Sequence, residues 1–347
     1  MKPDARNTPL TIPYDEIIML HDQPYDESTE DELYNITIAE ELGDVISTTG
    51  IKTTMMPFND DTISILAKKK QAGENFAIFN LVENVDRKPE WQPRAMEALE
   101  KLGVPFTGTD TGTLLACDAD KFRMKELLQS QNLPTPPYAT RNYTKPLYEN
   151  PGKWLVKSAI YHGSFNVKQE NVSEDPAYLL QLMQRYEDEF GGLWFADRYL
   201  PGREFFIGMI GMRGEDPELL PETELTFDAD YYSNGKLPFL TEDAKWEEPD
   251  DAHKTVGARY GELAPDSELR LKMEALATRS WHALGLGGYA RIDFRLDEAE
   301  QPCILEVNTN PYLAIIDDSY IYQPAARAGL TVADVLTKII LCANPAR

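Results

Sequence analysis

Two stretches near the end of the chain, Arg291-Ile292-Asp293-Phe294-Arg295 and Ile304-Leu305-Glu306-Val307-Asn308, alternate polar and apolar side chains. A polar turn over residues 297–302 lies between them. The pattern therefore predicts two antiparallel strands joined by that turn. In this pairing Asp293 lies opposite Glu306, and Arg291 lies opposite Asn308.

The predicted hairpin has one polar face and one apolar face, because successive side chains of a strand point to opposite sides. The apolar face would belong to the core and is formed by Ile292, Phe294, Leu305 and Val307. On the polar face, two carboxylates and an amide supply hard oxygen ligands that suit Mg²⁺. Arg291 beside them would stabilise an oxyanion or hold a carboxylate. The alternative is a solvated hairpin face held by two salt bridges, since strands with alternating charges are common.

Composition limits the classes of protein to which this chain can belong. Of its 347 residues, 42% are hydrophobic and 27% are charged, which is close to the ordinary globular range. The length exceeds that of one small core, and we expect three lobes. The formal net charge of −24 argues against nucleic acid or anionic lipid as a partner.

Nothing in the sequence indicates a membrane or an export signal. No apolar run approaches the roughly 20 residues that cross a bilayer, and the first residues lead into no signal-peptide hydrophobic region. We therefore expect a cytoplasmic protein. The three cysteines are widely spaced without a CxxC pair, so we interpret them as reduced thiols.

Apolar periodicity divides the chain into three parts. Strand candidates at 17–20 and 76–81, each followed by a helical pattern, predict a small doubly wound α/β lobe over roughly residues 14 to 108. The middle part opens with a helix over 120–129 and continues with a strand at 154–157. Strands at 194–199 and 203–210 then predict a hairpin or one sharply bent strand around Pro201-Gly202. A long helix over about 267–284 precedes the polar hairpin.

Several motifs, in order along nearly the whole chain, resemble those of the D-alanine-D-alanine ligases and their ATP-grasp relatives. Arg291-Ile292-Asp293 followed by Glu306-Val307-Asn308-Thr309-Asn310-Pro311 looks like the family's metal-binding signature. The earlier matches are Phe79-Asn80-Leu81-Val82-Glu83, Gly103-Val104-Pro105-Phe106-Thr107-Gly108, Asp120-Lys121 and Pro134-Thr135-Pro136. The resemblance implies an α/β ATP-grasp fold, with an N-terminal lobe over 1–108 and two lobes, 109–197 and 198–347, that sandwich ATP.

The resemblance also assigns residues to the phosphates of ATP. Lys121 and Lys157 would contact them, although either lysine alone reads as an ordinary helix or strand-end residue. Because the chain is so acidic, local lysines and Mg²⁺ must make the electrostatic potential of the site positive before a polyphosphate can bind. Gly163 and Ser164 would belong to a loop that closes over the phosphates. That loop departs from the family's Gly-Ser-Ser in having Gly163-Ser164-Phe165.

For the rest of the nucleotide, the resemblance points to the segment 197–204. Asp197, Arg198 and Leu200 would hold adenine, the last two mainly through backbone groups, and Glu204 would bind ribose, because a carboxylate accepts hydrogen bonds from two hydroxyls. Lys245 matches a lysine that contacts the γ-phosphate from a mobile loop. The alternatives are an exposed strand residue at Glu204 and a surface lysine at Lys245.

The implied reaction has two steps, transfer of the γ-phosphoryl group to a carboxylate and attack of an amine on the acyl phosphate. The resemblance makes Asp293, Glu306 and Asn308 ligands of Mg²⁺, or of Mn²⁺ in its place. Arg291 and a backbone N–H near Tyr312 would stabilise the oxyanion, with Ser164 and Lys245 as further catalytic groups. Closure of the loops 158–166 and 225–246 would exclude water.

The substrate pair is a separate question, because the family's substrate-binding positions differ here. Residues 22–27 lack the usual Gly-Gly and Ser, so only Glu27 matches there, and Trp246 replaces a loop tyrosine. Residues 312–318, which end in Asp317-Asp318, replace a stretch rich in glycine and hydroxyl groups that receives the second substrate's carboxylate.

Three hypotheses therefore stand. The first is a carboxylate-amine ligase whose substrates are not two D-alanines. The second is an authentic D-alanine-D-alanine ligase, and the third is an ATP-binding regulatory protein without turnover. The resemblance also suggests a homodimer.

Overall fold

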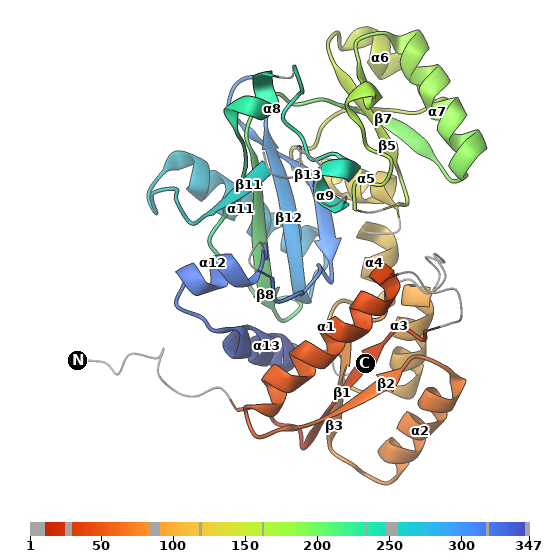
Figure 1. Cartoon of the computed structure of the whole chain (residues 1–347), viewed down its shortest axis with the longest axis vertical. Coiled ribbons are helices and arrows are strands. Elements are labelled where there is room, and N and C mark those ends of the chain that lie inside the picture. The colour runs from red at the N-terminus through yellow and green to blue at the C-terminus, as the bar shows by residue number, and fades with distance from the viewer. Residues whose placement is uncertain are drawn as a thin grey trace.

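A computed structural model describes residues 11–24, 30–83, 91–117, 120–161, 163–233, 235–246, 256–316 and 319–343. Within these residues, three β-sheets follow one another along the chain, with three, four and six strands. Figure 1 shows the first sheet and its helices at one end of the molecule and the other two sheets side by side at the opposite end. Each predicted segment thus holds one sheet, although the segment boundaries themselves stay a prediction.

The N-terminal sheet is parallel, in the order β2-β1-β3, and is doubly wound as predicted. All six residues of the central strand β1 are buried, which explains its apolar run. Ile17 and Met19 pack with helix α1 on one face, whereas Ile18 and Leu20 pack with α2 and α3 on the other. The elements are β1 (Glu16–His21), α1 (Glu30–Ser47), β2 (Lys52–Pro57), α2 (Asp60–Gln71), β3 (Phe76–Asn80) and α3 (Trp91–Leu102).

Strand β2 and helix α2 were not predicted from the sequence. Strand β2 lies at the sheet edge and none of its residues is fully buried, so its sequence has no strong apolar alternation. Helix α2 buries only Thr62 and Leu66, and its three lysines follow in the last turn, where they complement the helix dipole.

The central sheet is antiparallel in the order β4-β7-β5-β6 and is covered by α7. Trp154 and Trp194 from the sheet pack with Leu182 and Tyr186 of that helix. Asp175 caps the start of α7, and Gly191, with φ of 71°, ends it. The elements are β4 (Tyr138–Ala139), α6 (Lys145–Glu149), β5 (Trp154–Ser158), a 3₁₀ turn η2 (Gln169–Asn171), β6 (Val172–Ser173), α7 (Pro176–Phe190) and β7 (Trp194–Arg198).

The C-terminal sheet runs β11-β10-β8-β12-β13, with β9 paired to β8. Its core combines the sheet with α11 and also with α4 and α5, which lie earlier in the chain. Helix α11 spans the predicted range; Ser267 caps its start, and Gly285 ends it in a left-handed conformation. The elements are α4 (Thr111–Cys117), α5 (Lys121–Ser130), β8 (Glu204–Gly211), β9 (Glu218–Leu219), β10 (Thr223–Phe227), α8 (Ala229–Ser233), α9 (Glu242–Trp246), β11 (Val256–Tyr260), α11 (Glu268–Leu284), β12 (Gly288–Leu296) and β13 (Pro302–Thr309).

The strands β7 and β8 do not form the hairpin that was one of the two expectations for this segment. Strand β7 pairs with β4 and β5, whereas β8 pairs with β9, β10 and β12, so the chain changes sheet at Pro201-Gly202. The N–H of Gly202 donates to the Leu296 carbonyl at 3.0 Å. A Cβ at residue 202 would lie 2.6 Å from that same oxygen, so this crossing point requires glycine.

The last two helices, α12 (Tyr322–Arg327) and α13 (Val332–Leu341), return to the N-terminal lobe. Val335, Leu336, Ile339 and Ile340 of α13 join the core formed by α1 and β1. Among the described residues, no helix is both long enough and apolar enough to cross a membrane.

Candidate active site

The polar hairpin has the register that the sequence predicts. Strands β12 and β13 are antiparallel, with Asp293 opposite Glu306 and Arg291 opposite Asn308. One detail was wrong, because a β-bulge after Asp293 pairs Phe294 with Ile304 and skips Leu305. Ile304 therefore joins the core in place of Leu305, which is only partly buried.

Arg291, Asp293 and Asn308 form one hydrogen-bonded group on the polar face. Nε and one terminal nitrogen of Arg291 donate to the two carboxylate oxygens of Asp293 at 2.7 and 2.8 Å. Nδ2 of Asn308 donates to Oδ2 of Asp293 at 3.0 Å. Burial raises the pKa of Asp293, and the Arg291 charge opposes that shift. The group is too buried for a solvated hairpin face, since Asp293 is 8% exposed.

Lys121 connects Glu306 to the central lobe. Its Nζ lies 3.3 Å from Oε1 of Glu306 and donates to the Tyr161 carbonyl at 2.8 Å. Asp120 caps α5 through the N–H groups of Phe122 and Arg123. This cap fixes the helix start at Lys121, so the lysine enters the site from the first turn of the helix.

Lys157, at the end of β5, faces Asp197 of the neighbouring strand β7. Its Nζ lies 2.9 Å from Oδ2 of Asp197, and Nζ of Lys125 lies 2.9 Å from Oδ1 of the same carboxylate. Lys125 is fully buried, and this burial lowers its pKa. Sequence reasoning missed Lys125, although its position one helical turn after Lys121 was an available signal.

Glu204 also has a partner that sequence reasoning gave no role. Arg295 donates to Oε2 of Glu204 at 2.6 Å and to the Leu200 carbonyl at 2.5 Å. Burial raises the pKa of Glu204, while the Arg295 charge opposes the rise. Arg295 follows Asp293 by two residues on β12, and this alternation was the available signal.

The backbone groups assigned to adenine are partly engaged within the chain. The Arg198 N–H donates to the Pro137 carbonyl at 2.9 Å, and the Leu200 carbonyl accepts from Arg295. The Arg198 side chain lies on the outside, 3.2 Å from Glu298. Contact of these two residues with a base must therefore use the Arg198 carbonyl and the Leu200 N–H.

The chain just after the first segment predicted to close over ATP contacts the second predicted segment. Gly163 and Ser164 both have left-handed φ values, of 69° and 62°. This turn leads to Val167, whose carbonyl accepts from the Glu242 N–H at 2.9 Å. Glu242 begins α9, the helix that carries Lys245. The turn with Gly163 and the helix with Lys245 therefore approach the site together.

Lys245 belongs to the same electrostatic field as the polar hairpin. Burial lowers its pKa to about 8, and the Arg291 charge adds to the decrease while Asp293 and Glu306 oppose it. An amine with such a pKa holds a phosphate well when protonated and is poised near neutral pH.

The polar hairpin supplies a donor set that fits Mg²⁺ but does not enclose it. Asp293 and Glu306 are adjacent across the strands, and Asn308 uses its N–H on Asp293, which leaves its carbonyl oxygen for a cation. In the described part of the chain, no three His, Cys, Asp or Glu side chains gather into a metal site. Two carboxylates and one amide suit an ion that takes its other ligands from phosphates and water.

A narrow pocket, which we call the interlobe pocket, adjoins this face. It lies between the end of β3, helices α1 and α3, and the segment after β13. Its polar lining consists of Asn35, Asn80, Glu83, Gln92, Tyr289, Asn310 and Tyr312. Oδ1 of Asn310 accepts from the Thr109 N–H at 3.1 Å and occupies space that a side chain at Gly108 would fill. The sequence motif Phe79–Glu83 thus contributes four lining residues, of which Asn80 and Glu83 are polar.

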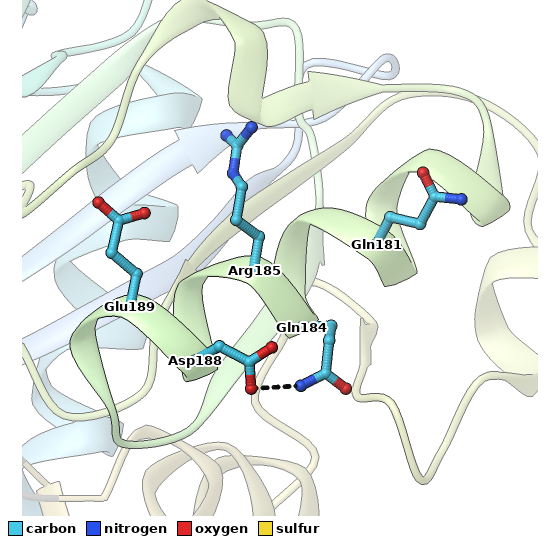
Figure 2. A pocket seen from close by; sticks show the side chains of 5 residues that line it. All are labelled: Gln181, Gln184, Arg185, Asp188 and Glu189. Atoms are coloured by element: carbon cyan, nitrogen blue, oxygen red, sulfur yellow. Dashed lines mark hydrogen bonds between the residues drawn. The ribbon is translucent and has the colours of Figure 1, made fainter.

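A second hollow lies over the exposed helix α7 and has a different character. Figure 2 shows its lining, in which Gln184 donates to Asp188 at 2.7 Å beside Gln181, Arg185 and Glu189. All five residues come from one helix at the outer edge of the central lobe (Figure 1). This hollow brings no distant elements together and offers no site chemistry.

Some predicted residues lie outside the described part of the chain. These are Glu27, Asp317 and Asp318, together with the side chain of Trp246. The interpretation of Asp317 and Asp318 as substrate contacts or helix caps therefore stays a prediction.

Comparisons with known proteins agree with this geometry. The family model described as "D-ala D-ala ligase C-terminus" matches residues 154–341. An uncharacterized protein, y4sG, of Sinorhizobium fredii is 26% identical over 238 residues, which are 68% of this chain and 66% of that relative, just under two thirds. A D-alanine–D-alanine ligase of Hydrogenovibrio crunogenus is 25% identical over 71% of this chain and 72% of its own length.

A solved structure shares the fold over almost the whole chain. The D-alanine–D-alanine ligase of Bacillus anthracis complexed with ATP superposes with a TM-score of 0.69 at 17% identity. The match covers 94% of this chain and 96% of that one. The α/β ATP-grasp fold predicted from the motifs is thereby confirmed.

Proposed function

Because the chain belongs to the D-ala D-ala ligase family, we propose that it is an ATP- and Mg²⁺-dependent carboxylate-amine ligase that forms an amide bond through an acyl phosphate. One observation carries the proposal. Arg291, Asp293, Glu306 and Asn308 share one strand face, and Lys121 joins that face to the phosphate-binding lobe. This arrangement has the charges that phosphoryl transfer to a carboxylate requires.

Each residue has a task in this reaction. Lys121, Lys157 and Lys245 bind phosphate oxygens, and Glu204, held by Arg295, accepts hydrogen bonds from ribose. Asp293, Glu306 and the carbonyl oxygen of Asn308 would hold Mg²⁺, which supplies charge neutralisation at the transferring phosphoryl group. Arg291 stabilises the oxyanion that forms when the amine attacks. The turn at Gly163-Ser164 excludes water from the acyl phosphate.

We propose further that the substrates are not two D-alanines. The sequence supports this, because residues 22–27 lack the family's Gly-Gly and Ser. Residues 312–318 likewise replace the stretch rich in glycine and hydroxyl groups that receives the second substrate's carboxylate. The similarity to an uncharacterized relative is compatible with a member of the family that has its own substrate.

An authentic D-alanine-D-alanine ligase is the second candidate, because the named ligases are nearly as similar as the uncharacterized relative. A regulatory protein without turnover is the third. The complete set of lysines, carboxylates and Arg291 argues against it, since a binding module needs fewer phosphate-transfer groups. A cytoplasmic location, a homodimer, and the exclusion of nucleic acid and membrane as partners stay predictions.

ADP release across a panel of amino acids and amines, with mass spectrometry of the products, tests the proposal. We expect Mg²⁺-dependent ADP release and one amide product that is not D-alanyl-D-alanine. Efficient synthesis of D-alanyl-D-alanine would favour the second candidate. ATP binding without release across the whole panel would favour the third.

A further inference from the structure

We propose that Lys125 is a positioning residue of the nucleotide site, whose charge cancels that of Asp197 so that Lys157 presents a net positive charge to the phosphates. The inference rests on the proposed function, because it concerns how ATP is held. It concerns a residue to which neither the family motifs nor the predicted site assigned a role.

Lys125 cannot touch ATP itself. It is fully buried in helix α5, whose Met124 and Leu128 belong to the core shared with the C-terminal sheet. Its Nζ lies 2.9 Å from Oδ1 of Asp197, whose other oxygen lies 2.9 Å from Nζ of Lys157. Any influence of Lys125 on a phosphate therefore passes through Asp197.

The contacts of Lys125 favour an ammonium group. Besides Asp197, its Nζ has two further acceptors, Oγ1 of Thr135 and the Pro136 carbonyl, each at 3.2 Å. An ammonium has three N–H donors, whereas a neutral amine would direct a lone pair at one of these oxygens. Burial lowers the pKa of Lys125, and the Lys157 charge adds to the decrease. The Asp197 charge and the two hydrogen-bond acceptors favour the protonated form.

The net charge of the cluster of Lys125, Asp197 and Lys157 then determines the local electrostatic potential at a bound phosphate. Two lysines and one aspartate give a net charge of plus one, whereas Asp197 and Lys157 alone would be neutral. Lys157 keeps access to the site, since its side chain is 16% exposed and the Glu306 and Glu204 charges act on it. In a chain with a net charge of −24, the sign of this local field matters for binding a polyanion.

A purely structural role would be served better by an apolar side chain. Helix α5 contributes Met124 and Leu128 to the same core, and burying an ion pair there costs more free energy than a methionine would. A side chain with the length of lysine but without the charge, Lys125→Met, is therefore the informative replacement.

The test measures dissociation constants by calorimetry for a non-hydrolysable ATP analogue and for adenosine. We expect Lys125→Met to weaken binding of the ATP analogue by about tenfold at low salt and that of adenosine by less than about twofold. The double variant Lys125→Met/Asp197→Asn restores the net charge of plus one. It should therefore recover analogue-to-adenosine selectivity to within about threefold of wild type. Lys125→Arg keeps the charge and should stay near wild type.

Lys68→Met, on the exposed end of α2, removes an equal charge far from the site and serves as the control. Unchanged affinity for the ATP analogue in Lys125→Met, equal loss for analogue and adenosine, or no recovery in the double variant would each overturn the inference. If Lys125→Met does not fold, the dissociation constants of Lys125→Gln and Lys125→Arg for the same two ligands are compared instead. Wild-type protein that fails to bind the analogue would instead contradict the proposed function.

Discussion

The two sides of the site are assembled differently. The side proposed to face the metal, called here the metal-facing side, comes from β12 and β13, neighbouring strands joined by a short turn. Strand pairing places its four polar residues on one face, and side-chain hydrogen bonds join three of them. The phosphate-facing side gathers Lys121 and Lys125 from α5, Lys157 from β5 and Asp197 from β7. The first side depends on a local pattern, whereas the second depends on packing between lobes. We therefore expect substitutions on the first side to affect chemistry and those on the second side to affect ATP binding.

The largest effect is expected for Glu306→Gln on the metal-facing side. Loss of this carboxylate removes a proposed metal ligand and the partner of Lys121, so ADP release should fall by about a thousandfold or more. The melting temperature should change little, because Glu306 is only partly buried. Glu298→Gln, on the outside of the molecule, is the matched control and should retain activity. Full activity of Glu306→Gln at subsaturating Mg²⁺ would show that the metal assignment is wrong.

On the phosphate-facing side, Lys157→Ala and Lys121→Ala should weaken binding of a non-hydrolysable ATP analogue by about 30-fold. The reason is the loss of a charge that faces phosphate in a partly buried site. Lys68→Ala, in the exposed last turn of α2, should bind like wild type. Calorimetry measures the three dissociation constants. Equal affinities for the three variants would contradict the assignment of Lys121 and Lys157 to the phosphates.

Arg295→Met tests a residue that belongs to both sides. Arg295 lies on β12 but holds Glu204 and the Leu200 carbonyl next to the predicted adenine site. Its loss leaves the partly buried Glu204 without its hydrogen-bonded cation, which should cost about 3 kcal/mol of unfolding free energy and raise KM for ATP about fivefold. Urea unfolding and steady-state kinetics measure the two effects. The double variant Arg295→Met/Glu204→Gln should regain part of the stability, and a single variant as stable as wild type would contradict the expectation.

The smallest expected effect concerns pH. Lys245, with a pKa of about 8, carries its charge below that pH, so kcat/KM for ATP should fall about threefold between about pH 7.5 and 8.5. At saturating ATP, kcat should persist to higher pH, because bound phosphate raises the pKa of the amine. Lys245→Arg keeps its charge throughout this range and should abolish the decrease. An identical decrease in the arginine variant would assign the titration to another group.

The two sides of the site also differ in how well the sequence predicted them. The register of β12 and β13 was read correctly from alternation, apart from the bulge that exchanges Leu305 for Ile304 in the core. A bulge adds one residue without changing composition, so an alternating pattern does not locate it. The ends of α11 were also predicted, because Ser267 and Gly285 act within one turn of the helix.

Other features depended on partners far along the chain. The segments at 194–199 and 203–210 predicted a hairpin or one sharply bent strand, yet at Gly202, beside Leu296, the chain crosses from one sheet to another. Strand β2 was missed because its position at the sheet edge leaves it without a continuous apolar pattern. Motif resemblance marked Lys121 and Lys157, but it gave no reason to select Lys125 or Arg295.

The sequence by itself determined which family this chain resembles, which strands carry its carboxylates and which face those carboxylates share. These conclusions follow from the two-residue period of a strand, which any local stretch displays. Only the tertiary structure decided that Asp197 lies between two lysines, that Arg295 holds Glu204, and that the turn after Gly163 meets the helix of Lys245. Charge pairs across lobes have no sequence period, because what fixes them is the packing of separate elements around a common core.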